Sequence, residues 1–338
     1  MPNMPAAPPD VSILLVNYKT PQLLIDCLHS VFTFTEGIDF EIVIVDNASE
    51  DQSEFIFRNA FPVARYPQVR WFDMGYNAGF GRANNFAMAQ ATGRNYLLLN
   101  TDTLLLDNLI ARCSQLLDQQ PDVAAVGAMQ VNRVGNVHTQ LYTSFAEVHR
   151  HAYILPPHPT VQRWLDRLFL PTPYADPNQV DWIIGAFLMT RRQTVAAAGG
   201  FDERFFMYGE DVEWGRRLGK QGRMLLLREA FFVHLEYGSD PTYQAKKVTY
   251  INRFTTQMQV STLLWIRLQY GAGAYLLLMA HYLLLLPVVF GWKILVNLRA
   301  GRAPLSNLTN QRAFATQVRV FLRFFWPTLT KKHIFYNV

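Results

Sequence analysis

The chain has 338 residues, of which 50% are hydrophobic and 17% charged, and it carries a net charge of +5 with a pI of about 9.2. This composition excludes a disordered chain and allows one large domain with an appended region. The two cysteines, Cys27 and Cys113, lie in helix-like apolar patterns, so we expect core residues in a reducing compartment. The Pro-rich residues 1–10 predict a flexible arm and no signal peptide.

Strand and helix patterns alternate along the first part of the chain. Continuous apolar runs predict buried strands at residues 11–18, 40–49, 69–74 and 95–100, with helical patterns between them. This alternation predicts an α/β fold with a doubly wound, mostly parallel sheet. Residues 132–179 are rich in loop signals, and we expect one helix there, around residues 161–168.

Polar residues follow the end of each predicted strand. They are Asn17-Tyr18, Asp46-Asn47, Gly75-Tyr76-Asn77 and Asn100-Thr101-Asp102. Any one group is explained by turn chemistry, because Asn, Asp and Gly are ordinary loop residues. Four groups at the carboxyl ends of neighbouring strands favour a ligand crevice along that edge of the sheet.

Asp102 stands between two leucine runs, and two roles are open for it. A carboxylate at the edge of the sheet suits a divalent metal that neutralises a nucleoside diphosphate. Alternatively, Asp102 caps a helix that the following leucines enter. Asp46 is a candidate acceptor for a base or ribose, while Gly79 and Gly81 open a helix whose free N–H groups suit a phosphate.

Two further features carry chemistry late in the same region. Glu210 and Asp211 are adjacent carboxylates at a predicted helix start, where they suit a general base or simply an acidic first turn. His234 ends an apolar strand, where it is either structural or able to reach a metal or phosphate.

Seven motifs occur together in order: ILLVNYKTPQLLIDCLHSV, IVIVDNASEDQS, GYNAGFGRANN, YLLLNTDT, GAFLMTRR, GGFDERFFMYGEDVEWGRRL and VHLEYGS. They resemble glycosyltransferase family 2, with its GT-A fold, over about residues 11–240. Within that family the chain is similar to the rhamnosyltransferase-like branch, which builds O-antigen and other cell-surface glycans.

The resemblance implies a role for each matched residue. Donor binding would involve Asn17, Tyr18, Asp46, Asn47, Asn77, Gly79, Asn100, Thr101 and Asp102. A divalent metal, Mg²⁺ or Mn²⁺, would be held by Asp102 with His234 as its protein partner; Asn100 stands where the family motif often has Asp. Asp211 would be the catalytic base, with Glu210 beside it. The acceptor region would include Trp182, Gly185, Ala186 and Trp214.

The implied reaction is a single in-line displacement with inversion. The expected donor is a nucleotide-sugar, dTDP-rhamnose first, and the expected acceptor is a glycan or a polyprenyl-diphosphate-linked sugar, not a nucleic acid. A nucleotidyltransferase is the enzyme alternative, although VNYKTPQ lacks the Gly-rich loop with Arg and Lys that it would need. A non-catalytic nucleotide-sugar-binding assembly protein is the other alternative, and the intact Glu210-Asp211 pair disfavours it.

Residues 242–338 are expected to form a separate, mainly helical region after the glycosyltransferase domain at 11–241. Their apolar run at residues 272–292 is just long enough to span a membrane, and basic residues flank both of its ends. We expect monotopic attachment at the cytoplasmic face of the plasma membrane, because amphipathic Trp and Tyr rings suit an interface. Soluble packing, a homodimer contact and a spanning helix are the alternatives.

Overall fold

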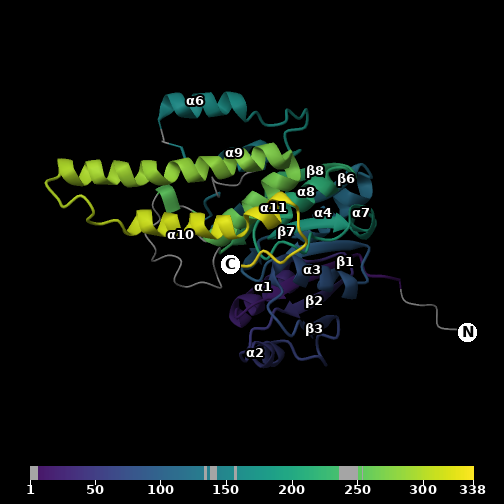
Figure 1. The fold of residues 1–338 in the computed structure, drawn as a ribbon. Coiled ribbons are helices and arrows are strands. Elements are labelled where there is room, and N and C mark those ends of the chain that lie inside the picture. The colour runs from purple at the N-terminus through teal and green to yellow at the C-terminus, as the bar shows by residue number, and fades with distance from the viewer. Residues whose placement is uncertain (1–6, 133–134, 138–142, 156–157, 236–249, 253) are drawn as a thin grey trace, which may run out of the picture. The chain divides into compact units, whose positions relative to one another are not determined.

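The computed structural model describes residues 7–132, 135–137, 143–155, 158–235, 250–252 and 254–338 (Figure 1). They group into two compact units. The sheet unit draws on Met1–Ser144, Thr172–Glu203 and Asp211–Gln244, and the helical unit on Phe145–Pro171, Arg204–Glu210 and Ala245–Val338. Most of the expected arm, and the expected boundary near residue 241, lie outside the described residues.

The sheet unit is built on eight strands in the order β3-β2-β1-β4-β7-β6-β8-β5. Their bounds are β1 Val11–Asn17, β2 Phe40–Asp46, β3 Val69–Asp73, β4 Asn95–Leu99, β5 Thr103–Leu105, β6 Val123–Val131, β7 Phe187–Arg191 and β8 Arg223–His234. Strands β3, β2, β1 and β4 are parallel, as are β6 and β8, while β7 and β5 run antiparallel to their neighbours. The predicted α/β fold with a mostly parallel sheet is confirmed.

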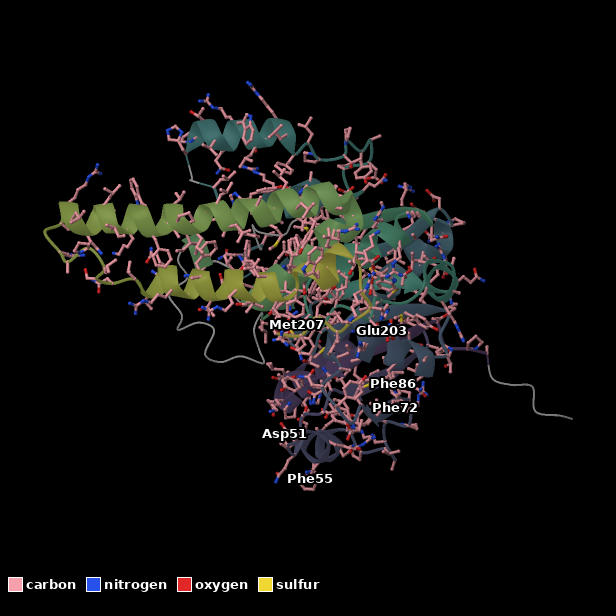
Figure 2. All side chains as sticks on the ribbon, in the orientation of Figure 1. Asp51, Phe55, Phe72, Phe86, Glu203 and Met207 are labelled. Carbon is pink, nitrogen blue, oxygen red and sulfur yellow. The ribbon has the colours of Figure 1, made fainter. Side chains whose placement is uncertain are left out.

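Helices cover both faces of this sheet, which explains its continuous apolar strands. They are α1 Pro21–Phe34, α2 Ser53–Ala60, α3 Gly79–Gln90, α4 Leu109–Gln119, α7 Arg192–Ala198 and α8 Glu210–Leu218. Successive strand residues point to opposite faces, so Ile13 packs with α1, α2 and α4 while Leu14 packs with α3 and α8. On the α3 face, Phe72 and Phe86 meet edge to face at 5.9 Å (Figure 2). Cys27 and Cys113 are buried core residues, as predicted.

The leucines after Asp102 form a strand and not the expected helix entry. Strand β5 pairs antiparallel with β8, and Thr103 lies opposite His234. Helix α4 begins only at Leu109, and Asn108 occupies its N-cap position. The helix-cap alternative for Asp102 is therefore wrong, because a strand separates that residue from the helix.

The helical unit contains α5 Phe145–Ala152, α6 Pro159–Leu168, the 3-10 turn η2 Tyr250–Asn252, α9 Thr256–Arg299, α10 Thr309–Arg323 and α11 Phe325–Leu329. Helix α6 matches the expected helix, whereas α5 was not predicted. Helices α9 and α10 lie side by side (Figure 1), and the Tyr282 ring packs against Phe314 and Phe321, which are seven residues apart on one face of α10. Helix α9 kinks at Gly271, whose φ is 89°.

Candidate active site

Asn17 and Asp46 end neighbouring parallel strands and lie opposite each other in the sheet. Asn17 Nδ2 donates to Asp46 Oδ1 at 2.6 Å, and Ser49 donates its N–H to Oδ2 and its hydroxyl to Oδ1 at 2.9 and 2.6 Å. A carboxylate has about four lone-pair positions, so three are occupied by the protein and about one is left for a ligand. The Asp46 carboxylate is thus held in one orientation.

Asn47, which follows β2, and Asn77, which follows β3, connect these strand ends to the start of helix α3. Asn47 Nδ2 donates to Asn77 Oδ1 at 2.9 Å, and Asn47 Oδ1 accepts from the N–H of Ala78 at 2.8 Å. Asn77 Oδ1 also accepts from the N–H of Gly79, whose φ of 74° favours glycine. The N–H groups of Ala78 and Gly79 are thus engaged within the protein. The expected phosphate contact of this helix start stays a prediction for the N–H groups that follow in its first turn.

Three residues after β1 and β2 have left-handed backbone conformations although none is glycine. Lys19, Ala48 and Glu50 have φ values of 59°, 56° and 51°. The N–H of Lys19 donates to Ser49 Oγ at 2.8 Å, which ties this loop to the Asp46 network. The Lys19 ammonium lies 5.3 Å from the centre of the partly buried Tyr18 ring. Strained backbone of this kind concentrates at ligand sites.

Asp102 and His234 lie together at the same edge of the sheet, brought there by the pairing of β5 with β8. His234 Nε2 is 3.3 Å from Asp102 Oδ1 and 3.4 Å from Asn100 Nδ2. On the other side of the ring, Nδ1 is 2.8 Å from Gln130 Oε1. An amide oxygen only accepts hydrogen bonds, so Nδ1 carries a proton and the neutral ring has its lone pair on Nε2.

This arrangement fits a divalent cation. In the neutral tautomer two electron-rich atoms, His234 Nε2 and Asp102 Oδ1, face each other, and a second hydrogen bond orients the histidine as is usual for a metal-ligating ring. Within the described part of the chain, no group of three or more His, Cys, Asp or Glu side chains is placed to hold a metal ion by itself. A metal here would therefore need oxygen ligands from a bound diphosphate or water.

Thr101 and Asn100 are linked to other loops of this edge. Thr101 Oγ1 is 3.0 Å from Thr20 Oγ1, and Thr20 donates to Asn17 Oδ1 at 3.2 Å, which is compatible with Thr101 acting as the donor to Thr20. The N–H of Asn100 donates to the carbonyl of Ala186 at 3.1 Å. The predicted donor-binding strand ends and the loop before β7 thus form one connected edge.

Asp211 is the second residue of α8. Its Oδ2 accepts from the N–H of Gly185 at 3.2 Å, and its Oδ1 accepts from the N–H of Val212 at 2.9 Å. Burial raises the pKa of the Asp211 carboxyl to about 6, and these N–H donors oppose the rise. A pKa near neutrality is what a general base needs. Glu210, 5% exposed, precedes it and groups with the helical unit.

Gly185 packs closely against a side chain of α3. A Cβ on this residue would lie 3.0 Å from the Phe80 ring and 3.9 Å from Asp211 Cβ, so the Phe80 ring would have to shift to accept a larger residue. Trp182 is 8% exposed, and its indole N–H has no hydrogen-bond partner among the described residues. Gly185 and Trp182 therefore remain candidates for the acceptor region, together with the buried Ala186.

Trp214 is a core residue and not an acceptor-binding one, which corrects the sequence-based expectation. Its side chain is 0% exposed, its Nε1 donates to the carbonyl of Gly199 at 2.8 Å, and its ring packs on Phe201 at 4.3 Å. Because its ring face and its N–H are both engaged by the protein, Trp214 anchors α8 to the core of the sheet unit.

Three partners of the site were not predicted: Gln130, Ser49 and Thr20. Gln130 and His234 are 104 residues apart in the chain. They meet because β6 and β8 pair in parallel. Ser49 lies in the quoted IVIVDNASEDQS motif, yet nothing in that motif distinguishes a carboxylate-orienting serine from a turn residue.

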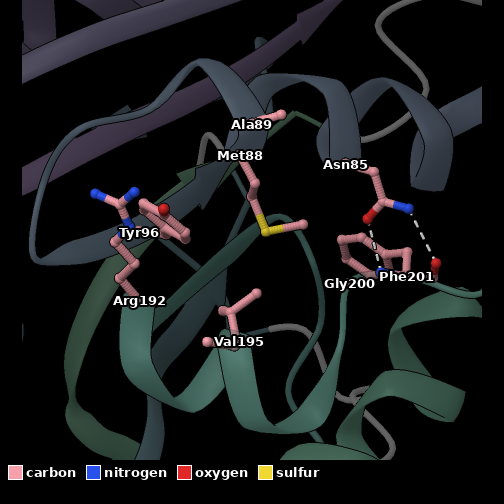
Figure 3. Close-up of a pocket in the computed structure, with 9 residues that line it drawn as sticks. Asn85, Met88, Ala89, Tyr96, Arg192, Val195, Gly200 and Phe201 are labelled. Carbon is pink, nitrogen blue, oxygen red and sulfur yellow. Dashed lines mark hydrogen bonds between the residues drawn. The ribbon is translucent and has the colours of Figure 1, made fainter.

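A separate cavity of about 380 Å³ lies between α3, the start of β4 and α7 (Figure 3). Tyr96, Arg192 and Met88 line it, and Asn85 closes one side by bonding both the N–H and the carbonyl of Phe201. Tyr96 is the second residue of β4, at the opposite end of the strand from Asn100. This cavity is therefore not part of the edge described above.

Comparisons with known proteins identify the family and the fold of the chain. The sequence profile described as "Glycosyl transferase family 2" matches residues 12–195. The chain is 29% identical over 241 residues to the O-antigen biosynthesis protein RfbC of Myxococcus xanthus, covering 68% of this chain and 18% of that protein. It is also 29% identical over 223 residues to an N-acetylglucosaminyl-diphospho-decaprenol L-rhamnosyltransferase of Mycobacterium tuberculosis, covering 62% of this chain and 70% of that one.

Solved structures share the fold. The mannosyltransferase PcManGT from Pyrobaculum calidifontis, in complex with GDP-Man and Mn²⁺, matches with a TM-score of 0.54 and 16% identity over 97% of this chain and 89% of that one. S. aureus TarS 1–349 with UDP-GlcNAc matches with a TM-score of 0.51 and 14% identity, covering 81% and 66%. The family profile covers more than half of the sequence, and the chain belongs to glycosyl transferase family 2.

Proposed function

We propose that this protein transfers a sugar, with inversion, from a nucleoside-diphosphate sugar to a hydroxyl group of a glycan or lipid-diphosphate-linked acceptor. The observation that carries the proposal is the Asp102–His234 pair, 3.3 Å apart and oriented by Gln130, on the same connected edge as the Asp46 network. The edge offers an acceptor for a nucleoside and a pair of metal ligands, which are the features that a nucleotide-sugar requires.

Donor binding uses both ends of this edge. Asp46, held by Asn17 and Ser49, accepts a hydrogen bond from the base or ribose. Asp102 and His234 would hold a Mg²⁺ or Mn²⁺ ion, which when bound neutralises charge on the leaving diphosphate. The similarity to an L-rhamnosyltransferase and to an O-antigen biosynthesis protein supports dTDP-rhamnose as the first donor to test.

Asp211 takes the proton of the acceptor hydroxyl. As that proton moves to the Asp211 carboxylate, the hydroxyl oxygen bonds to the anomeric carbon while the bond from that carbon to the diphosphate breaks. Its raised pKa supports the role, because a carboxylate with a pKa of about 6 is a stronger base than an ordinary one and is still mostly ionised near pH 7. Attack opposite the leaving group inverts the anomeric configuration.

A donor screen tests this function. The purified protein is incubated with dTDP-rhamnose, UDP-sugars and GDP-mannose, with a polyprenyl-diphosphate-linked N-acetylglucosamine acceptor, in Mn²⁺ or in EDTA. We expect metal-dependent release of nucleoside diphosphate and a glycosylated acceptor, both lost in Asp102→Ala and His234→Ala. Asp107→Asn is the matched control, because Asp107 is an exposed aspartate paired with Arg112 at 2.9 Å.

A parallel incubation and one further outcome of the screen identify the alternatives. Formation of nucleotide-sugar when the protein is given a nucleoside triphosphate and a sugar phosphate would indicate a nucleotidyltransferase. Binding of a nucleotide-sugar without turnover under any condition would indicate a non-catalytic binding protein.

We also propose that the helical unit attaches to the cytoplasmic surface of a membrane without crossing it. Among the described residues, α9 is the helix that is both long enough and apolar enough to cross a membrane. Only 22% of its apolar 18-residue window is buried. Its inner face buries Tyr275, Leu278, Met279, Tyr282 and Val289. Its outer face exposes Leu276, Leu277, Leu283, Leu284, Val288, Trp292, Leu295 and Leu298, so the exposed side is apolar as well.

Charge supports the same proposal. Residues 241–338 contain twelve Lys and Arg residues and no Asp or Glu. Such a segment is attracted to an anionic lipid surface, and the exposed Arg299 and Arg302 lie where α9 ends. Membrane attachment would bring the enzyme to a lipid-diphosphate-linked acceptor.

Flotation with lipid vesicles tests the attachment. We expect the protein to float with vesicles containing anionic lipid and to need detergent for release, while a Leu277→Glu, Leu284→Glu, Val288→Glu variant stays in solution. Phe55→Glu is the control, because Phe55 is also an exposed apolar residue, 66% exposed, but lies on α2 of the sheet unit. Wild-type protein that stays monomeric and soluble beside vesicles would refute attachment, and a detergent-free dimer would indicate a homodimer contact.

A further inference from the structure

The segment Arg204–Glu210 directly precedes Asp211 in the chain, yet it groups with the helical unit while both flanking segments belong to the sheet unit. Within it, Tyr208 and Gly209 have φ values of 67° and 81°. Glycine adopts this left-handed backbone readily and tyrosine does not. A turn of this kind persists only where its surroundings hold it, and α8 begins at the next residue.

Helix α9 holds the turn. Ser261, which is 1% exposed, donates its hydroxyl to the carbonyl of Met207 at 2.7 Å; Met207 is labelled in Figure 2. A Cβ on Gly209 would lie 3.6 Å from the Phe205 ring and 3.8 Å from Ser261 Cβ, which is ordinary contact distance. The turn therefore rests directly on the Ser261 position of α9.

The start of the same segment is held by residues 335–336. The N–H of Tyr336 donates to the carbonyl of Arg204 at 2.9 Å, Phe205 and Tyr336 form a parallel bridge, and the rings of Phe206 and Phe335 meet at 5.4 Å. The segment Arg204–Glu210 is thus also joined to residues 335–336 within the helical unit.

Gln257 links the two attachments. Its Nε2 lies 2.9 Å from the Tyr336 carbonyl and 3.2 Å from Ser261 Oγ, one turn further along α9. The Gln257 amide therefore contacts both groups that hold the segment Arg204–Glu210. It orients Ser261, which bonds Met207, and it bonds Tyr336, which bonds Arg204.

We propose that Ser261, oriented by Gln257, is a positioning residue for the base Asp211. By holding the turn at Met207–Gly209, Ser261 sets where the first turn of α8 begins and thereby where the Asp211 carboxylate points. This inference rests on the proposed role of Asp211 as the base. In this role the buried Ser261 acts through the backbone and not on the substrate, because one peptide bond joins Glu210 to Asp211.

The direct test is Ser261→Ala. A misplacement of about 1 Å costs up to about 100-fold in rate, so we expect kcat to fall about 10- to 100-fold. Affinity for dTDP-rhamnose, measured by titration calorimetry, should be unchanged, and the acidic limb of the kcat/KM pH profile should shift. Ser261→Thr, which keeps the hydroxyl, should restore the rate.

Thr262→Ala is the matched control. Thr262 follows Ser261 on α9, and its hydroxyl donates to the Met258 carbonyl one turn back in the same helix at 2.8 Å. We expect wild-type kinetics. If Ser261→Ala does not fold, as judged by thermal melting, Gln257→Met is measured in its place with the same expected loss.

A second arm separates this inference from the proposed function. In an Asp211→Asn background, Ser261→Ala should cause no further loss of the residual rate, since the group it positions is gone. A wild-type kcat in Ser261→Ala or Gln257→Met, or an equal loss in both backgrounds, would overturn the positioning role. Near-normal turnover of Asp211→Asn alone would instead overturn the base assignment.

Discussion

The same four residues, Tyr-Leu-Leu-Leu, occur in β4 and twice in α9, and their surroundings are opposite. In β4, Leu97, Leu98 and Leu99 are 0–2% exposed. In α9, Leu277 and Leu284 are 63% and 71% exposed. In the sheet, helices cover both faces of the strand, whereas the described residues cover α9 on one side only. An apolar run thus specifies burial only when the architecture supplies a partner for each of its faces.

The sheet unit and the helical unit also differ in their acidic residues. The sheet unit carries carboxylates at its strand ends and at the start of α8. Asp46 and Asp211 each accept hydrogen bonds from at least two donors, and Asp102 faces His234. The C-terminal part of the helical unit, residues 245–338, has no acidic residue. The carboxylates proposed for catalysis and metal binding therefore lie in the sheet unit, whereas residues 245–338 supply a basic and apolar surface.

Removing the base is the change with the largest expected effect on the sheet unit. In Asp211→Asn we expect kcat to fall about 10²- to 10⁴-fold with donor affinity retained, because only proton transfer to this carboxylate is lost. Steady-state kinetics and calorimetric donor binding measure the two quantities. Equal losses of both would contradict a role confined to proton transfer.

Leucine truncation tests the comparison between β4 and α9 directly. We expect Leu97→Ala to lower the free energy of unfolding by about 2–5 kcal/mol, because it leaves a cavity in a packed core. Leu284→Ala should change it by less than about 0.5 kcal/mol, because the side chain is exposed. Urea unfolding of the two variants without lipid or detergent gives the values; similar losses would mean that α9 is covered on both sides in solution.

Gln130→Leu tests the orientation of the metal site. Without the amide oxygen, His234 loses the partner that fixes its tautomer. We expect the Mn²⁺ concentration for half-maximal activity to rise about 10- to 100-fold, as for other partners of metal-bound histidines. Activity is measured across a Mn²⁺ titration, and an unchanged midpoint would separate His234 from metal binding.

The pH dependence of stability gives the smallest expected effect. The Asp211 pKa is raised from 3.8 to about 6, so the folded protein binds the proton more tightly than the unfolded chain. Its ionisation therefore destabilises the fold progressively between these two pKa values, and the full penalty is present above pH 6. We expect Asp211→Asn to be more stable than wild type by roughly 1–3 kcal/mol at pH 7.5, with the difference vanishing near pH 3.5. Melting at both pH values checks the sign.

The sequence predicted the local features well. The strands, the helices between them and the polar residues at strand ends follow from periodicity and turn chemistry, which act over a few residues. Those rules did not reveal α5 or the fate of the leucines after Asp102, because Thr103–Leu105 become a strand only by pairing with β8. They also assigned Trp214 to the acceptor region, whereas its packing places it in the core.

By itself the sequence determined the α/β class, the order of the motifs and the carboxylates that suit a nucleotide-sugar, since these depend on residue type and spacing. Tertiary structure alone decided which atoms meet. His234 is paired with Asp102 and Gln130, Asp211 lies against Gly185, and Ser261 supports the turn before α8. Each of these contacts joins residues far apart in the chain, and such contacts depend on strand order and helix packing, which no local pattern encodes.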